Sequence, residues 1–177
     1  MLGETFEMVT EHYRFIGEKV YHRPQQVTAY CLEGEHYKLQ MYQSGNPKFM
    51  LNGGKGKLCI EMTGCRDLYF KKYDEHCSFM HPKFMIKNLI WGGNFPDVGG
   101  SLTAINHTTG EKVLMELQER NSAGDDSKIS GQAFDSQGNL AIEITGSWLD
   151  QIQITTLATG VTETIWSEPP MLENAHL

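Results

Sequence analysis

The sequence predicts an all-β fold, built as an antiparallel meander, sandwich or barrel. Three observations support this prediction. Short runs rich in β-branched and aromatic residues, or alternating in polarity, recur along the chain. Turn signals such as Asn52-Gly53-Gly54 and Gly92-Gly93-Asn94 separate these runs at spacings typical of tight antiparallel connections. No segment has the periodicity of a convincing amphipathic helix.

The expected strands divide into an early set and a late set. The early set is Tyr13–Val20, Val27–Leu32, Tyr37–Gln43, Lys48–Leu51, Lys57–Thr63 and Tyr69–Tyr73. The late set is Phe84–Trp91, Ser101–Asn106, Lys112–Leu117, Lys128–Phe134, Leu140–Ile144 and Gln151–Thr156. Ser44-Gly45-Asn46-Pro47 and Gly99-Gly100 are expected turns. The 177 residues suit one domain, with a core over 1–166 and a flexible tail over 167–177.

Two expected strands differ in how they are covered. In Lys57–Thr63, the apolar side chains of Leu58, Ile60 and Met62 alternate with those of Lys57, Cys59 and Glu61, which predicts one buried face and one wet or polar face. Phe84–Trp91 is apolar almost throughout, so we expect cover on both of its faces. A barrel that holds an apolar ligand meets that need.

Composition and charge exclude several classes of function. A net charge of −7 disfavours broad binding to nucleic acid. No apolar run approaches the roughly 20 residues that span a bilayer. No basic segment followed by an apolar one opens the chain, so we expect no secretory signal. Cys31, Cys59, Cys65 and Cys77 form no CxxC pair, which indicates free thiols in a reducing compartment.

Signals for catalysis and metal binding are weak. Neither a G-x-S-x-G elbow nor a G-x-x-x-x-G-K-[ST] phosphate loop occurs. His76 and His81, with Cys77 between them, offer an incomplete metal site, and an exposed loop is the favoured interpretation of this stretch. We therefore expect no catalytic residue, no metal and no cofactor, and an enzyme using His22 or this loop ranks last.

The stretch EKVYHRP gathers charge directly before an expected strand. Arg23 is a permanent cation suited to bidentate phosphate contact, and His22 donates to phosphate when protonated. Pro24 stiffens the turn that carries both. From the residues alone, two interpretations stay open: an ordinary solvated turn or an anion site.

Six short motifs, in order, resemble the oxysterol-binding-protein-related family of lipid-transfer domains. That family has an L-G-E-T-type segment before the fingerprint E-Q-V-S-H-H-P-P, and the chain matches with LGETFE and EKVYHRP. The further matches are IKNLIWGG, INHTTG, KISG and ITGSW, and together the motifs cover the chain from Leu2 to about Gln153.

The resemblance implies a fold, ligands and site residues. The fold is an incomplete antiparallel β-barrel around a lipid-sized tunnel, with a lid at its N-terminal side. The ligands are a sterol or phosphatidylserine, exchanged for phosphatidylinositol 4-phosphate. The fingerprint histidines that touch the inositol phosphate correspond to His22 and Arg23. We add Lys19 as a helper, and expect a cytoplasmic protein that meets membranes peripherally and transiently.

The chain departs from the family fingerprint at several positions. Lys19, Tyr21, Arg23 and Gln25 replace its glutamine, serine, second histidine and second proline, and Gln26 is an extra residue. Family members also extend beyond both ends of the matched region. Without a lid, an open apolar tunnel is expected to find a partner, either a membrane or a second copy of the chain in a homodimer. The rival interpretation is a truncated barrel that serves as a protein-interaction or scaffold domain.

Overall fold

The computed structural model describes residues 2–23, 26–51, 54–121 and 127–169. These residues contain strands and turns but no helix. The strands are β1 Thr5–Val9, β2 Tyr13–Tyr21, β3 Val27–Gly34, β4 Tyr37–Met50, β5 Lys57–Thr63, β6 Cys65–Phe70, β7 Glu75–Met80, β8 Lys83–Lys87, β9 Phe95–Asn106, β10 Lys112–Leu117, β11 Lys128–Phe134, β12 Leu140–Ser147, β13 Gln151–Thr156 and β14 Val161–Ser167. The all-β antiparallel prediction is confirmed.

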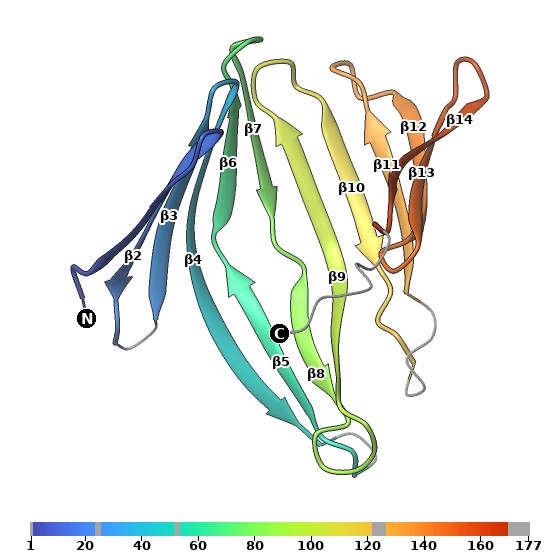
Figure 1. The fold of residues 1–177 in the computed structure, drawn as a ribbon. Helices are drawn as coiled ribbons and strands as arrows, with labels where there is room; N and C mark the ends of the chain where they lie inside the picture. The colour runs from blue at the N-terminus through green and yellow to red at the C-terminus, as the bar shows by residue number, and fades with distance from the viewer. Residues whose placement is uncertain (1, 24–25, 52–53, 122–126, 170–177) are drawn as a thin grey trace.

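All the strands belong to one antiparallel sheet with two tiers in its middle (Figure 1). β4 and β9 are its long strands, of 14 and 12 residues. Between them, β5 pairs with β8 in one tier, and β6 pairs with β7 in the other. β1 and β14 end the strand order without pairing to each other, so the sheet stays open.

Gly64 carries the chain from the tier that contains β5 and β8 to the tier that contains β6 and β7. It separates β5 from β6 and has a φ of 117°, in the region that favours glycine. A Cβ at this position would lie 2.0 Å from the carbonyl oxygen of Tyr42 on β4. The close approach of the two backbones therefore requires a residue without a side chain.

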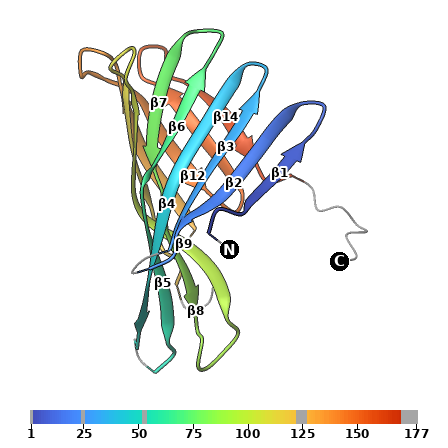
Figure 2. The same cartoon turned by 90° about the vertical axis from the view of Figure 1, so that its left-hand side faces the viewer.

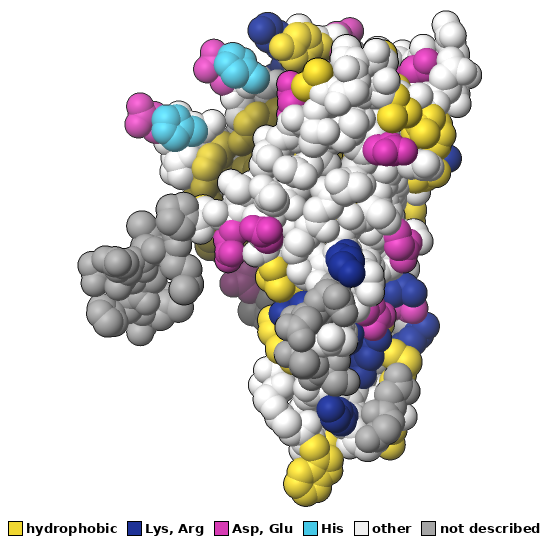
Figure 3. Space-filling view, turned by 90° about the vertical axis from the view of Figure 1, so that its right-hand side faces the viewer, with side chains coloured by type: hydrophobic (Ala, Val, Ile, Leu, Met, Phe, Trp, Pro, Cys, Tyr) yellow, Lys and Arg dark blue, Asp and Glu magenta, His cyan; other side chains and the backbone are white. Residues whose placement is uncertain are grey.

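The sheet curves so that its first and last strands come forward on the same side (Figure 2). The register places Tyr30, Met41, Arg66 and Phe79 in one row on the resulting inner face. The same face continues to the buried cluster of Leu117, Ile129 and Ile144 on β10, β11 and β12. The alternate residues point outward, and few apolar side chains show over the last strands in Figure 3.

A cluster of charges ties β5 and β8 to the segment after β10. The carboxylate of Asp97 on β9 has no exposed surface and lies 2.7 Å from Nζ of Lys87. Glu119 accepts from Lys57 at 2.6 Å and lies 3.3 Å from Lys87. Arg120 lies 3.4 Å from Asp97, with its guanidinium over the rings of Phe95 and Trp148. Because these cations and carboxylates alternate, each buried charge has a partner of opposite sign.

Four expected strands are confirmed residue for residue: Lys57–Thr63, Lys112–Leu117, Lys128–Phe134 and Gln151–Thr156. The expected turn at Ser44–Pro47 is wrong, because β4 runs through it without interruption. Pairing with β3 stops at Ser44, so Pro47 lies where β4 has only β5 as a neighbour. A proline is tolerated on such an edge because it has no N–H to offer a second strand.

Other expectations for the middle of the chain are also wrong. Gly99 and Gly100 lie inside β9 rather than in a turn. The expected strand Phe84–Trp91 ends at Lys87, and Trp91 is 72% exposed, so this segment is not covered on both faces. The stretch around His76 is strand β7 rather than an exposed loop.

The ends of the chain add two strands that the pattern did not predict. β1 and β14 are edge strands whose residues are all exposed. They therefore lack the alternation of buried and exposed residues by which a strand is recognised in a sequence. The expected flexible tail over 167–177 begins at the last residue of β14, and its residues 170–177 lie outside the described part of the chain. The four cysteines are free, as expected.

Candidate functional site

The predicted site residues lie at the β2–β3 connection. Lys19 is in β2, and its register partner Thr28 is in β3. His22 and Arg23 follow the last residue of β2 and are exposed. Pro24, which matches the fingerprint, and Gln25, which departs from it, lie outside the described residues. The structure therefore places the two fingerprint residues in an exposed connection, with Lys19 close behind them in the strand.

A hydrogen bond spans this connection. Nζ of Lys19 donates to Oε1 of Gln26 over 3.2 Å. Gln26, which looks like an insertion in the sequence, thus orients the amine of Lys19. Within the described ranges, no carboxylate forms an ion pair with Lys19 or Arg23. The connection is therefore a cationic rim without built-in counter-charges.

A cavity of about 500 Å³ begins at this rim. Gln26 and Thr28 line it on one side, and the side chains of Ile60 and Met62 line it on the other. Gln43, Gly45, Asn46 and Pro47 of β4 complete the lining. Register pairs Lys19 with Thr28 and Thr28 with Gln43, so all three lie on the inner face. The cavity therefore has a polar side at Gln26, which holds the amine of Lys19, and an apolar wall at Ile60 and Met62.

The apolar wall agrees in part with the sequence prediction for Lys57–Thr63. Ile60 and Met62 line the cavity, as expected for the apolar face of that strand. Cys59 was assigned to the wet or polar face, and this is wrong, because it is only 4% exposed. It is paired with Met85 of β8, which is 2% exposed, so this second face is also covered.

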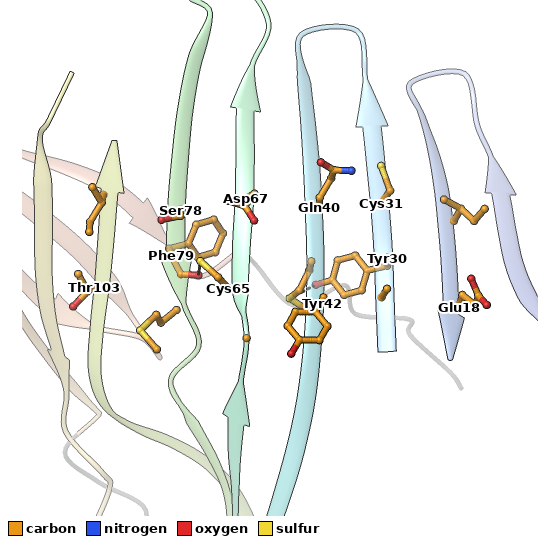
Figure 4. Close-up of a pocket in the computed structure, with 16 residues that line it drawn as sticks. Glu18, Tyr30, Cys31, Gln40, Tyr42, Cys65, Asp67, Ser78, Phe79 and Thr103 are labelled. Atoms are coloured by element: carbon orange, nitrogen blue, oxygen red, sulfur yellow. Dashed lines mark hydrogen bonds between the residues drawn. The ribbon is translucent and has the colours of Figure 1, made fainter. Parts of the chain in front are cut away.

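A larger hollow of about 890 Å³, shown in Figure 4, is lined by Tyr30, Met41 and Phe79 of the inner row as well as by residues that alternate with them. Its floor crosses β2, β3, β4, β6, β7 and β9, with Cys31, Gln40, Asp67 and Ser78 among the lining residues. Beside it, Nε2 of His76 lies 2.8 Å from Oδ1 of Asp67, and its ring stacks on that of Tyr69 at 4.4 Å between centroids. His76 thus has a structural role in packing β6 against β7.

The incomplete metal site does not assemble. His76 bonds to Asp67 on the outer face, whereas Nε2 of His81 lies 2.8 Å from Sδ of Met41 on the inner face. Over the part of the chain that the structure describes, no three histidine, cysteine or acidic side chains group in a way that would hold a metal ion. The same residues include no helix with the length and apolar character that crossing a bilayer takes.

The model of one protein family, described as oxysterol-binding protein, matches residues 1–176. The chain belongs to the oxysterol-binding protein family. Relatives agree: it is 31% identical over 151 residues to oxysterol-binding protein 11 of Dictyostelium discoideum and 28% identical over 153 residues to human oxysterol-binding protein-related protein 2. These matches cover 84% and 85% of the chain but only 26% and 31% of the relatives' lengths.

Solved structures of ORD domains share the fold. The Osh1 ORD domain in complex with cholesterol matches with a TM-score of 0.83 at 18% identity. The Osh3 ORD of Saccharomyces cerevisiae in complex with PI(4)P matches with a TM-score of 0.77 at 23% identity. Each match covers 98% of this chain and 45% of the solved one. These two matches agree in fold with the family membership that the family model and the relatives show, and the predicted membership is confirmed.

Proposed function

We propose that the chain binds a lipid and carries it between membranes without covalent chemistry. The cavity beneath the β2–β3 connection holds the apolar part of the lipid. His22 and Arg23, helped by Lys19, hold an anionic headgroup at its mouth. The ligands we propose are a sterol or phosphatidylserine in one direction and phosphatidylinositol 4-phosphate in the other, in the cytoplasm and at membrane surfaces.

One observation supports this proposal: the cavity has an apolar wall and, on its other side, a residue bonded to the cation Lys19. This residue is Gln26, which lines the cavity and accepts from Lys19. Burial of an acyl chain or a sterol ring against Ile60 and Met62 contributes affinity at about 25 cal/mol per Å². The unpaired cations select the headgroup, because a phosphate gains charge-assisted hydrogen bonds there that a neutral lipid lacks.

The solved relatives support this choice of ligands. One was crystallised with cholesterol and another with PI(4)P, and both share the fold of the chain. Arg23 stands where the fingerprint has a histidine, so the cationic contact is retained with a longer, forked side chain.

The experiment is extraction of labelled lipid from liposomes that contain phosphatidylinositol 4-phosphate and a sterol. We expect the chain to extract both lipids. A His22→Ala/Arg23→Ala double variant should lose at least about tenfold of phosphoinositide extraction, as two charge-assisted contacts predict. The matched control is His12→Ala/Arg14→Ala, which removes the same residue types at the other end of β2. Loss of extraction in the control alone, or extraction of neither lipid by the unmodified chain, contradicts the proposal.

A protein-interaction role is the second candidate, and the two open edges favour it. β1 and β14 present unpaired backbone together with exposed apolar side chains, including Phe6 at 64% and Ile165 at 57% exposure. Such edges accept a further strand from a partner or from a second copy of the chain. Sedimentation velocity of the purified chain, run beside the extraction assay, separates an associating scaffold from a monomeric carrier.

A further inference from the structure

Three hydrogen-bond donors converge on one sulfur atom in the middle of the inner face. The hydroxyl of Tyr30 lies 3.1 Å from Sδ of Met41, Nε of Arg66 lies 2.9 Å from it, and Nε2 of His81 lies 2.8 Å from it. A thioether is a weak acceptor, and it is uncharged. In the protein without a ligand, the three strong donors around the sulfur therefore have only a weak acceptor.

The register explains why these groups meet. Tyr30, Met41 and Arg66 are direct cross-strand partners on β3, β4 and β6. His81 comes from the short segment between β7 and β8, where the chain passes between the two tiers. Met41 is 4% exposed and His81 is 8% exposed, so the cluster lies at the base of the inner face rather than at its rim.

The charge of this cluster is only partly compensated. Arg66 forms no ion pair with any carboxylate in the described ranges, and its guanidinium lies over the ring of Phe79 at 5.6 Å from the centroid. Nδ1 of His81 is buried without a hydrogen-bond partner. A half-buried cation whose neighbours are a thioether and an aromatic ring, beside a buried unsatisfied nitrogen, is only partly compensated by them. A buried polar group without a partner calls for a specific explanation, and a bound ligand is one.

We propose that Tyr30, Arg66 and His81 bind the anionic oxygen group at the end of an apolar ligand, for which a fatty-acid carboxylate is the simplest case. The guanidinium provides a fork that matches two carboxylate oxygens, and the hydroxyl of Tyr30 donates to the same group. Apolar rings, including those of Phe15 and Phe79, flank the cluster on the inner face and suit a hydrocarbon chain.

This site is separate from the mouth at His22 and Arg23. Tyr30 lies three residues beyond Val27 along β3, which corresponds to about 10 Å of strand. A carboxylate held by Arg66 is therefore bound inside the sheet, while the mouth remains free for a phosphate. The inference does not depend on phosphoinositide binding at the mouth.

The test compares oleate with methyl oleate, which has the same chain and no charge, by titration of the purified protein. We expect oleate to bind at least about tenfold more tightly than the ester, since the charged contact to Arg66 is lost in the ester. Arg66→Met should abolish that preference and Tyr30→Phe should reduce it. Arg14→Met, which removes an exposed arginine paired with Glu7, should leave it unchanged.

A second measurement locates the ligand. The methyl resonance of Met41 in protein labelled with ¹³C-methyl methionine should move on addition of oleate, and that of the exposed Met8 on β1 should not. Equal binding of acid and ester, or an unmoved Met41 resonance at saturation, overturns the proposal. So does a loss of oleate binding in the His22→Ala/Arg23→Ala variant with binding retained in Arg66→Met. Circular dichroism of each variant confirms that the comparison is made between folded proteins.

Discussion

The amine of Lys19 reaches across the β2–β3 connection and donates to the side chain of Gln26 over 3.2 Å. This contact fixes a positive charge over the opening of the cavity that Gln26 itself lines. It also gives a role to a residue that has no counterpart in the family fingerprint. The insertion thus supplies a hydrogen-bond acceptor that holds a cation in place while leaving its charge uncancelled.

The first prediction concerns this pair. Gln26→Leu removes the acceptor but keeps the bulk, so we expect a loss of about threefold to tenfold in phosphoinositide extraction, equivalent to the net contribution of one ordinary hydrogen bond. Sterol extraction should change by less than about twofold, since the apolar wall is intact. The measurement is the liposome assay with both lipids. A parallel fall in the two activities would indicate damage to the cavity instead of the mouth.

The second prediction concerns Asp97. Asp97→Ala leaves Lys87 and Arg120, which are mostly buried, without their shared carboxylate. Breaking a buried pair from one side costs about 3–5 kcal/mol in the free energy of unfolding. Urea denaturation measures this, with Asp150→Ala in an exposed turn as the control. A loss below about 1 kcal/mol would contradict a structural role for this buried carboxylate.

The third prediction concerns Gly64. Gly64→Ala places a methyl group against the carbonyl oxygen of Tyr42 at a φ that alanine rarely adopts. We expect a loss of at least about 2 kcal/mol in the free energy of unfolding. Gly93→Ala is the matched control, because nothing lies within 4 Å of a Cβ at that position. Similar denaturation midpoints for the two variants would argue against a tight passage between the tiers.

The fourth prediction concerns pH. Burial lowers the pKa of His81, and the positive charge of Arg66 lowers it further. The unfolded chain, with an ordinary histidine pKa of about 6.5, therefore binds more protons than the folded one below that pH. Stability from this group is complete above about pH 6.5 and is lost as the pH falls. The wild type should thus lose more stability than His81→Leu between pH 8 and pH 5, and parallel curves would contradict this.

The sequence predicts the fold where burial alternates or where turns are tight. Lys112–Leu117 and Lys128–Phe134 alternate clearly and are found as predicted. β14 is exposed along its whole length, so no alternation marks it. β4 contains Gly45 and Pro47, which locally favour a turn, and only the pairing of its two halves with different strands explains why it stays extended.

The candidate sites differ in how much the sequence reveals. His22 and Arg23 are adjacent in sequence and match a family motif, so they are found without a structure. Tyr30, Arg66 and His81 are spread over 52 positions and meet only because β3, β4 and β6 pair in one register. The strand expected from the sequence begins only at Tyr69, so the pattern did not place Arg66 on either face, and the register of β6 does. No local pattern shows that Arg66 lacks a carboxylate partner among the described residues.

The two-tier middle of the sheet has a consequence for how the chain folds. β1 to β4 pair in sequence order, as do β9 to β14, so each set can form from local hairpins that close quickly. In the middle, β4 also pairs with β6 and β9 also pairs with β7, and each of these pairs is separated in sequence by an intervening strand. We therefore expect the rate-limiting step of folding at the junction beside Gly64. There the strands β1–β4 and β9–β14, which pair early, are connected through β5–β8 into one sheet.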